Sequence, residues 1–226
     1  MPTELHLALQ RLYAGEEGVI EAPLGGYRAD VLRDGICYEI QTGSFGSIRR
    51  KLEKLLVTQP VVLVFPVPQQ KIIVQVDGEG REVSARRSPK RGRAVDVFSH
   101  LLYLRELPAH PNFSLDVLLT VQRELRRKDG MGSWRRQGVS LIGRELVEVV
   151  EAQRFEQPAE LARLLPPELP KEFTTAELRE VLALRGGICG KMAYALRELG
   201  VIEQVGKRGN SLVYRKAKKR RRKSGG

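Results

Sequence analysis

The sequence predicts an α+β or α/β protein: a mixed β-sheet flanked by helices, followed by two helices and a hairpin. Residues 27–42 alternate around the turn pair Asp34-Gly35, which is typical of a β-hairpin. A helical pattern and two apolar strands follow before residue 77, in the order expected when a helix packs on a mixed sheet. Residues 173–215 show the terminal pattern of two helices and a hairpin.

The N-terminal region predicts a helix and the first part of the sheet. Thr3 is a good N-cap, and apolar residues recur at helical spacing over residues 3–13. Glycines and a proline on either side of residues 19–21 predict turns around a short strand. After the hairpin, we expect Ser47 to cap a helix that runs to about residue 57.

The middle of the chain alternates between apolar and basic segments. Residues 81–93 contain six basic residues without apolar periodicity, which predicts an exposed loop. The remaining expectations are strands at 61–65 and 71–76, a helix at 95–107, a strand at 115–121 before a basic cluster, mixed strand and helix at 141–154, and a short helix at 158–165.

Composition shifts divide the chain into four expected parts. These are a core domain over residues 1–110, a connecting α/β segment over 111–170, a second domain over 171–216 and a basic tail over 217–226. Residues 215–223 hold eight basic residues in nine, and without them the net charge falls from +12 to +4. Such a tail favours any polyanion, although a solubilising or targeting role stays open.

The composition also limits the class of protein. Cys37 and Cys189 are far apart and lie outside any metal-binding spacing, which favours a reducing compartment and argues against zinc. The longest apolar run, residues 61–67, is too short to span a membrane, and the first ten residues lack signal-peptide features. We therefore expect a cytoplasmic protein without a membrane partner.

Three polar residues of the predicted hairpin suggest chemistry. Asp30 and Glu39 fall at about the same level on neighbouring strands, and Glu39 and Gln41 share one face of their strand. Two carboxylates held this close repel each other unless a cation lies between them or one is protonated. Mg²⁺ prefers such oxygen ligands and keeps waters, one of which can attack a phosphate.

These residues resemble the PD-(D/E)XK nuclease superfamily, whose signature is an acid, a hairpin and then Glu-x-Lys. The resemblance covers about residues 1–76 and implies a restriction-endonuclease-like core. It implies that Asp30, Glu39 and the backbone carbonyl of Ile40 bind Mg²⁺ or Mn²⁺, and that Glu4 on the first helix assists.

The sequence departs from that signature where the family usually has lysine. Gln41 can hold a water but supplies no positive charge, so Lys51, Arg50 or Lys54 on the following helix are candidates to replace the lysine. The alternative is that Asp30 and Glu39 lie on a solvated face of the sheet and take no part in catalysis. Within the resemblance, the catalytic residues are Glu4, Asp30, Glu39 and Gln41.

The C-terminal pattern resembles a winged-helix domain. Thr174 or Thr175 caps the first helix, Gly186-Gly187 makes the turn, and Gly200 ends the second helix before a hairpin with a basic tip. The resemblance implies that the second helix enters the DNA major groove and that the hairpin touches the backbone. The implied contacts are Lys191, Tyr194 and Arg197 on the helix, and Lys207, Arg208 and Asn210 on the hairpin. A domain that binds protein instead of nucleic acid is the alternative.

Taken together, the patterns predict a DNA-binding, Mg²⁺-dependent endonuclease that hydrolyses phosphodiester bonds. Two alternatives stay open: a non-catalytic DNA-binding protein with a degenerate nuclease fold, and an RNA- or ribosome-associated factor, because a basic tail does not distinguish polyanions. A homodimer also stays open.

Overall fold

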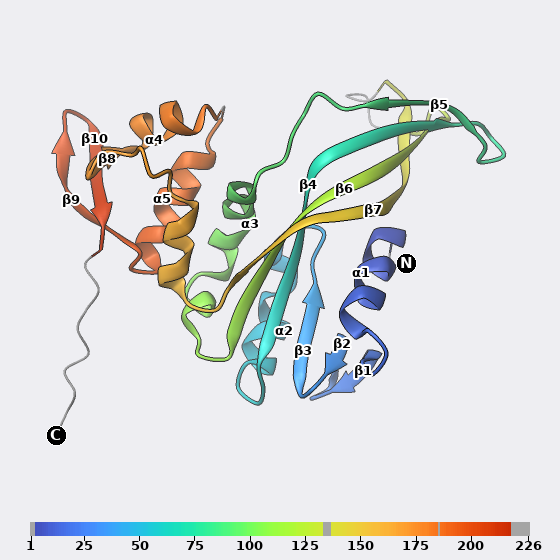
Figure 1. Cartoon of the computed structure of the whole chain (residues 1–226), viewed down its shortest axis with the longest axis horizontal. Coiled ribbons are helices and arrows are strands. Elements are labelled where there is room, and N and C mark those ends of the chain that lie inside the picture. Colours follow the sequence, from blue (N-terminus) through green and yellow to red (C-terminus); the bar gives the residue numbers. More distant parts are fainter. Residues whose placement is uncertain (1–2, 133–136, 185, 218–226) are drawn as a thin grey trace.

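The computed structural model describes residues 3–132, 137–184 and 186–217. A seven-stranded mixed sheet forms the body, in the order β1-β2-β3-β4-β6-β7, with β5 paired to β4 (Figure 1). Its strands are β1 (Val19–Leu24), β2 (Tyr27–Arg33), β3 (Ile36–Ile40), β4 (Val61–Val76), β5 (Glu82–Arg87), β6 (Phe113–Lys128) and β7 (Val139–Phe155). Strands β3, β4 and β6 run parallel to one another, and the other pairs are antiparallel.

Helices cover both faces of this sheet (Figure 1). Helix α1 (Glu4–Ala14) packs Leu5 and Leu9 on one face, and Thr3 caps it as predicted. The other face is covered by α2 (Arg49–Leu55) and α3 (Phe98–Leu101), together with the 3-10 turns η1 (Phe45–Ser47), η2 (Ala94–Val97), η3 (Leu102–Leu104), η4 (Leu107–Ala109) and η6 (Pro158–Leu164). Strand β4 is apolar at consecutive positions because both of its faces are buried.

Strand β4 is one continuous strand where two short strands were predicted. Pro66 and Pro68 lie inside this strand. A proline has no backbone N–H, so it cannot donate a hydrogen bond to a neighbouring strand. Here β3 pairs with β4 only as far as Val64, and β5 pairs with it only from Ile72. One side of β4 is therefore unpaired between these residues, and the prolines fall in that interval.

Three predictions for the middle of the chain were wrong. Part of the expected loop at 81–93 forms β5, which is exposed throughout and pairs with the far end of β4. The segment at 141–154 lies within a single strand, β7, with no helix. The helix expected at 95–107 is a series of short turns around α3. In each case pairing or packing with a distant segment outweighs the local pattern.

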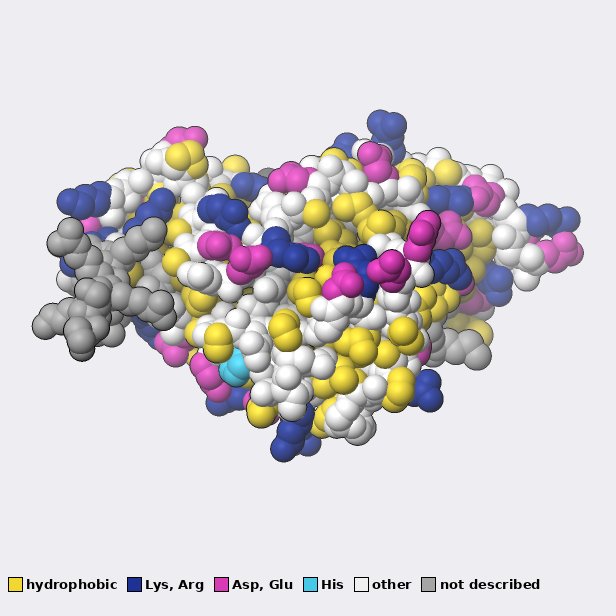
Figure 2. Space-filling model, turned by 60° about the horizontal axis from the view of Figure 1, so that its bottom comes forward, with side chains coloured by type: hydrophobic (Ala, Val, Ile, Leu, Met, Phe, Trp, Pro, Cys, Tyr) yellow, Lys and Arg dark blue, Asp and Glu magenta, His cyan; other side chains and the backbone are white. Residues whose placement is uncertain are grey.

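The far ends of the long strands project from the body as an arm (Figure 1). The arm consists of β5 and the paired segments 72–76 of β4, 123–127 of β6 and 140–145 of β7. The basic cluster predicted near residue 125 therefore lies in strand β6, where Arg126 pairs with Glu124. Figure 2 shows basic and acidic side chains interleaved over one face of the molecule, in keeping with the small net charge of the folded body.

The C-terminal unit contains two helices and a small sheet. Its elements are β8 (Glu172–Thr174), α4 (Thr175–Leu182), α5 (Ile188–Glu198), β9 (Ile202–Arg208) and β10 (Ser211–Lys216), and the sheet order is β8-β10-β9. Thr174 caps α4 in a capping box with Glu177. Gly200, at φ +68°, follows α5 in the left-handed conformation, as predicted.

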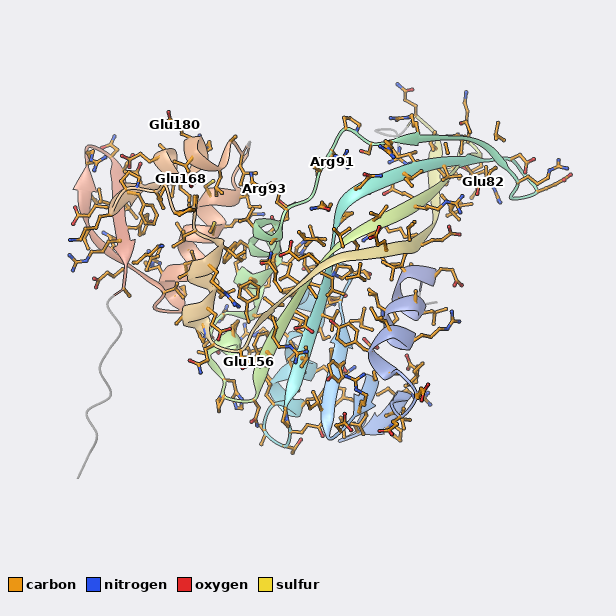
Figure 3. The ribbon with its side chains drawn as sticks, viewed as in Figure 1. Glu82, Arg91, Arg93, Glu156, Glu168 and Glu180 are labelled. Carbon is orange, nitrogen blue, oxygen red and sulfur yellow. The ribbon has the colours of Figure 1, made fainter. Side chains whose placement is uncertain are left out.

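The C-terminal unit shares a hydrophobic core with the body. Helix α5 packs on α3 and η3, and Leu101 and Leu196 belong to the same buried cluster. The guanidinium of Arg93 donates to the carbonyl of Leu182 at the end of α4. Figure 3 labels Arg93 on the segment between β5 and α3. The body sheet also runs across the boundary expected at residue 110, because β6 and β7 lie beside β4.

In the three ranges that the structure describes, no helix has both the length and the apolar character needed to cross a membrane.

Candidate active site

The predicted carboxylate hairpin is formed by β2 and β3. Asp34 and Gly35 have φ of +52° and +72° and make a two-residue turn, as the sequence predicts. Val31 pairs with Tyr38, which places Asp30 level with Glu39. At this level the carboxylate of Asp30 enters the ladder: its Oδ2 accepts the backbone N–H of Ile40 at 2.7 Å. A side-chain hydrogen bond therefore joins the two strands at the open end of the hairpin, opposite its turn.

Glu39 is a buried carboxylate with a lysine partner. Only 1% of its surface is exposed, and Lys51 Nζ from α2 lies 2.6 Å from its Oε2. Lys51 also donates to the carbonyl of Arg28 on β2. Burial first, and then the charge of Asp30, raise the pKa of Glu39 to about 7, although Lys51 opposes the shift. Glu39 can therefore exchange a proton near neutral pH.

Cys37 completes the surroundings of Glu39. Its thiol donates to Glu39 Oε1 at 3.5 Å. Burial raises the pKa of Cys37 to about 12, so this thiol stays protonated and acts as a donor. Both oxygens of Glu39 therefore have a donor, one charged and one neutral.

A second set of side chains meets Asp30 from α1 and β1. His6 Nε2 lies 3.4 Å from Asp30 Oδ1, and one ligand atom from each of His6, Glu21 and Asp30 lies within 4.8 Å of the others. Gln10, one turn after His6, donates to Glu21 Oε1 at 2.8 Å. The hydrogen bond to Asp30 outweighs burial and raises the pKa of His6.

Two predicted residues lie elsewhere. Glu4 is exposed in the first turn of α1 and is not part of the group around Asp30. Two positions along a helix turn a side chain by about 200°, so Glu4 and His6 leave on opposite sides. Gln41 follows the end of β3, and its amide nitrogen donates to the carbonyl of Ser44 and the hydroxyl of Ser47, at 3.2 and 3.0 Å. Gln41 thus stabilises the loop that follows β3, residues 41–47, which we call the exit loop.

The predicted N-cap of α2 was wrong. Ser47 was expected to cap α2, but its hydroxyl donates to Ser44 and accepts from Gln41, and Ile48 occupies the cap position without a side-chain hydrogen bond. His6, Gln10 and Glu21 were not among the predicted site residues. The four-residue spacing of His6 and Gln10 was a usable signal, because residues at i and i+4 share a helix face.

Among the described residues, His6, Glu21 and Asp30 are the ones whose ligand atoms lie close enough together to hold a metal ion, and Glu39 is outside that group. Carboxylate oxygens are the donors that Mg²⁺ and Mn²⁺ prefer, and a neutral imidazole nitrogen is also a ligand for Mn²⁺. Glu39 is instead paired with Lys51. Ile40, whose carbonyl was expected to be a ligand, sits at the end of β3 between Glu39 and Gln41, with its N–H bound by Asp30.

The polar residues singled out on α5 share its exposed side. Lys191 and Tyr194 are exposed, and the guanidinium of Arg197 lies 5.6 Å from the centre of the Tyr194 ring. On the terminal hairpin, Lys207 and Asn210 are exposed, whereas Arg208 makes an ion pair with Glu177 at 2.8 Å. Most of the other side of α5 is buried against α4 and α3.

The fold and the site define a mixed α+β protein with a buried carboxylate–lysine cluster at one end of its sheet. Residues 3–156 match the family model described as "Domain of unknown function (DUF8091)", and the chain belongs to that family. It is 30% identical over 215 residues to an "Uncharacterized protein" of Treponema pallidum (strain Nichols), which covers 95% of this chain and 85% of that protein. No solved structure matches the chain.

Proposed function

We propose that this protein is a Mg²⁺- or Mn²⁺-dependent deoxyribonuclease with the PD-(D/E)XK type of core. One observation carries the proposal: Lys51 lies 2.6 Å from Glu39, beside Asp30. The lysine that the Glu-x-Gln sequence lacks is thus supplied from the next helix. An ammonium group beside two carboxylates is the combination that phosphodiester hydrolysis needs.

The order of the elements supports this proposal. A helix, three antiparallel strands, a second helix and a parallel strand follow one another in α1, β1, β2, β3, α2 and β4. The first helix, the hairpin and the Glu-x-Gln segment thus follow one another as the resemblance of residues 1–76 implies. Asp30 occupies the position of the family's acid at the open end of the hairpin, and Glu39 occupies the position of the glutamate on the next strand.

Each residue then has a distinct role. Asp30 and Glu39 would hold the metal ion, which when bound supplies a water of lowered pKa and an electrophile for the phosphate. Lys51 would orient the attacking water and stabilise the charge that develops on the phosphate. His6 and Gln10 position Asp30 and Glu21, because they contact these residues from α1.

The C-terminal unit would deliver the core to DNA. The order β8, α4, α5, β9 and β10, with β8 beside β10, supports the winged-helix resemblance. Lys191, Tyr194 and Arg197 would face the DNA from α5, and the hairpin would contact its backbone. The basic tail, mostly outside the described residues, would add counterion release.

Cleavage of supercoiled and linear DNA by the purified full chain tests the proposal. We expect nicks or breaks with Mg²⁺ or Mn²⁺ and none with excess chelator. Absence of cleavage on duplex, branched and single-stranded DNA with both metals would contradict the enzymatic proposal.

A non-catalytic DNA-binding protein is the second candidate, and Gln41 favours it. Its amide is engaged in the exit loop and contributes no charge to the site. In this case the wild-type chain would bind DNA and cleave none, and substitution of Asp30 would leave its affinity for DNA unchanged.

Restoring the family lysine provides a further prediction. We expect Gln41→Lys to reduce cleavage, because Lys51 already supplies a cation and a second one would weaken metal binding. The substitution also removes the hydrogen bonds that hold the exit loop. Calorimetric Mg²⁺ titration beside the cleavage assay measures both effects. An increase of about tenfold or more, which corresponds to about 1.4 kcal/mol, would mean that Lys51 does not replace the missing lysine.

The hairpin residues should differ in their effect on DNA binding. Lys207 is exposed, whereas Arg208 is paired with Glu177. We expect Lys207→Gln to reduce the slope of log affinity against log salt by about 0.9 on duplex DNA, and Arg208→Gln to reduce it by less. Fluorescence anisotropy over a salt series measures both slopes. Equal slopes in wild type and Lys207→Gln would remove this hairpin from the DNA interface.

A further inference from the structure

A cleft adjoins the carboxylate site at the base of the arm. Its volume is about 400 Å³, and it lies between α1, β4 and the segment that links β5 to α3. Leu5 and Thr42 line one side of it, and these residues neighbour His6 and Gln41. The cleft therefore borders the segments of the chain that carry His6 and Gln41.

Two unpaired cations face this cleft. Lys90 comes from the segment after β5, and Arg144 comes from β7. Neither side chain has a hydrogen bond or ion pair with another described residue, whereas Lys71, a third lining cation, is paired with Glu124 at 3.3 Å. Asp96 is the acidic residue of the lining, and its Oδ2 already accepts the N–H of Arg93. A hydrogen bond from a backbone N–H does not neutralise a carboxylate, so Lys90, Arg144 and Asp96 together leave one net positive charge at the cleft.

The inner wall of the cleft is apolar and aromatic. The rings of Phe65 and His100 lie side by side, with centroids 5.0 Å apart, and both line the cleft. Burial first, and then the nearby Lys191, lower the pKa of His100, which favours the neutral form of this ring. The buried Nδ1 of His100 has no hydrogen-bond partner among the described residues. The His100 ring and the two cations therefore line the same cleft.

We infer that this cleft binds a single strand of DNA, with phosphates on Lys90 and Arg144 and a base against His100. The inference rests on the proposed nuclease function and names the form of its substrate. Grooves that bind single strands combine positive charge along the backbone with aromatic rings on which bases stack. A cleft of this size admits a nucleotide but not a duplex, and a paired base must be extruded before it enters such a site.

Binding in the presence of chelator tests the inference without cleavage. The full chain is titrated into a labelled single-stranded oligonucleotide and into the same sequence as duplex. We expect Lys90→Gln/Arg144→Gln to weaken single-strand binding by roughly tenfold or more, with little change for duplex. The salt slope on single strands should fall by about 1.4, since each phosphate contact contributes about 0.7.

The matched control is Arg11→Gln/Lys54→Gln, which removes two exposed cations outside the cleft lining. Unchanged single-strand affinity in the cleft variant, or an equal loss in the control, would overturn the inference. If the double variant unfolds, Lys90→Gln alone decides, because Lys90 is exposed. Cleavage by a wild type whose cleft variant binds normally would leave the nuclease proposal intact and remove only the cleft. If the wild type does not cleave DNA but its single-strand binding depends on the cleft, the cleft is kept as a binding site and the nuclease proposal is removed.

Discussion

Lys51→Met is expected to lower metal-dependent cleavage by about 10²–10³-fold, the size of effect seen when one group that stabilises the transition-state charge is removed. Lys51 is the cation nearest to Glu39, and it also donates to the carbonyl of Arg28. Methionine keeps much of the side-chain length and packing while removing the charge. Single-turnover cleavage measures the loss, and circular dichroism confirms that the variant is folded.

The pH dependence gives this variant a second readout. Lys51 lowers the pKa of Glu39 against the effects of burial and of Asp30. Without Lys51 that pKa rises above about 7, so the carboxylate that would bind metal is protonated over a wider pH range. Residual cleavage should therefore recover only as the pH is raised, and the acidic limb of the profile should move to higher pH.

Arg50→Met is the matched control, because Arg50 is exposed and lies next to Lys51 on the same helix. It should retain cleavage and an unshifted pH profile. Full activity in Lys51→Met would remove Lys51 from the proposed site, and equal losses in both variants would indicate a general effect of charge on DNA binding.

Asp116→Ala is expected to give the largest loss of stability. Asp116 is 5% exposed on β6, and it accepts hydrogen bonds from the Tyr13 hydroxyl and from two nitrogens of Arg154, each at 2.8 Å. Removing one partner of a buried ion pair costs about 3–5 kcal/mol. Because the Arg154 side chain is 43% exposed and water can reach it, we expect about 2–3 kcal/mol. For a chain of this size that loss lowers the Tm by roughly 5–10 °C.

The same change should reach the candidate active site. Tyr13 lies near the end of α1, and its bond to Asp116 ties this helix to the sheet. Helix α1 also places His6 in contact with Asp30, and Gln10 in contact with Glu21. We therefore expect Asp116→Ala to weaken metal binding as well, as measured by Mn²⁺ titration below the Tm. Glu151→Ala, on the exposed part of β7, is the control; an equal Tm in wild type and Asp116→Ala would contradict this role.

The sequence by itself determined the elements whose signals are local. Thr3 caps α1, Asp34-Gly35 closes the hairpin and Gly200 follows α5, as predicted, and Thr174, one of the two predicted candidates, caps α4. Each of these depends on hydrogen bonds or backbone angles within a few residues, so the residue types alone specify them. The hairpin also determined that Asp30 lies level with Glu39, because a two-residue turn sets the register.

Only the tertiary structure decided which distant residues meet. Strand β5 has no apolar pattern of its own, and it is a strand because β4 has an unpaired edge beside it. Lys51 was one of three candidate cations on its helix, and the rotation of α2 against the sheet selects it for Glu39. His6 and Glu21 reach Asp30 through the packing of α1 and β1, whereas Glu4 points away. Such contacts depend on the orientation of whole elements, which is set by burial of their apolar faces and is not encoded in any short stretch of sequence.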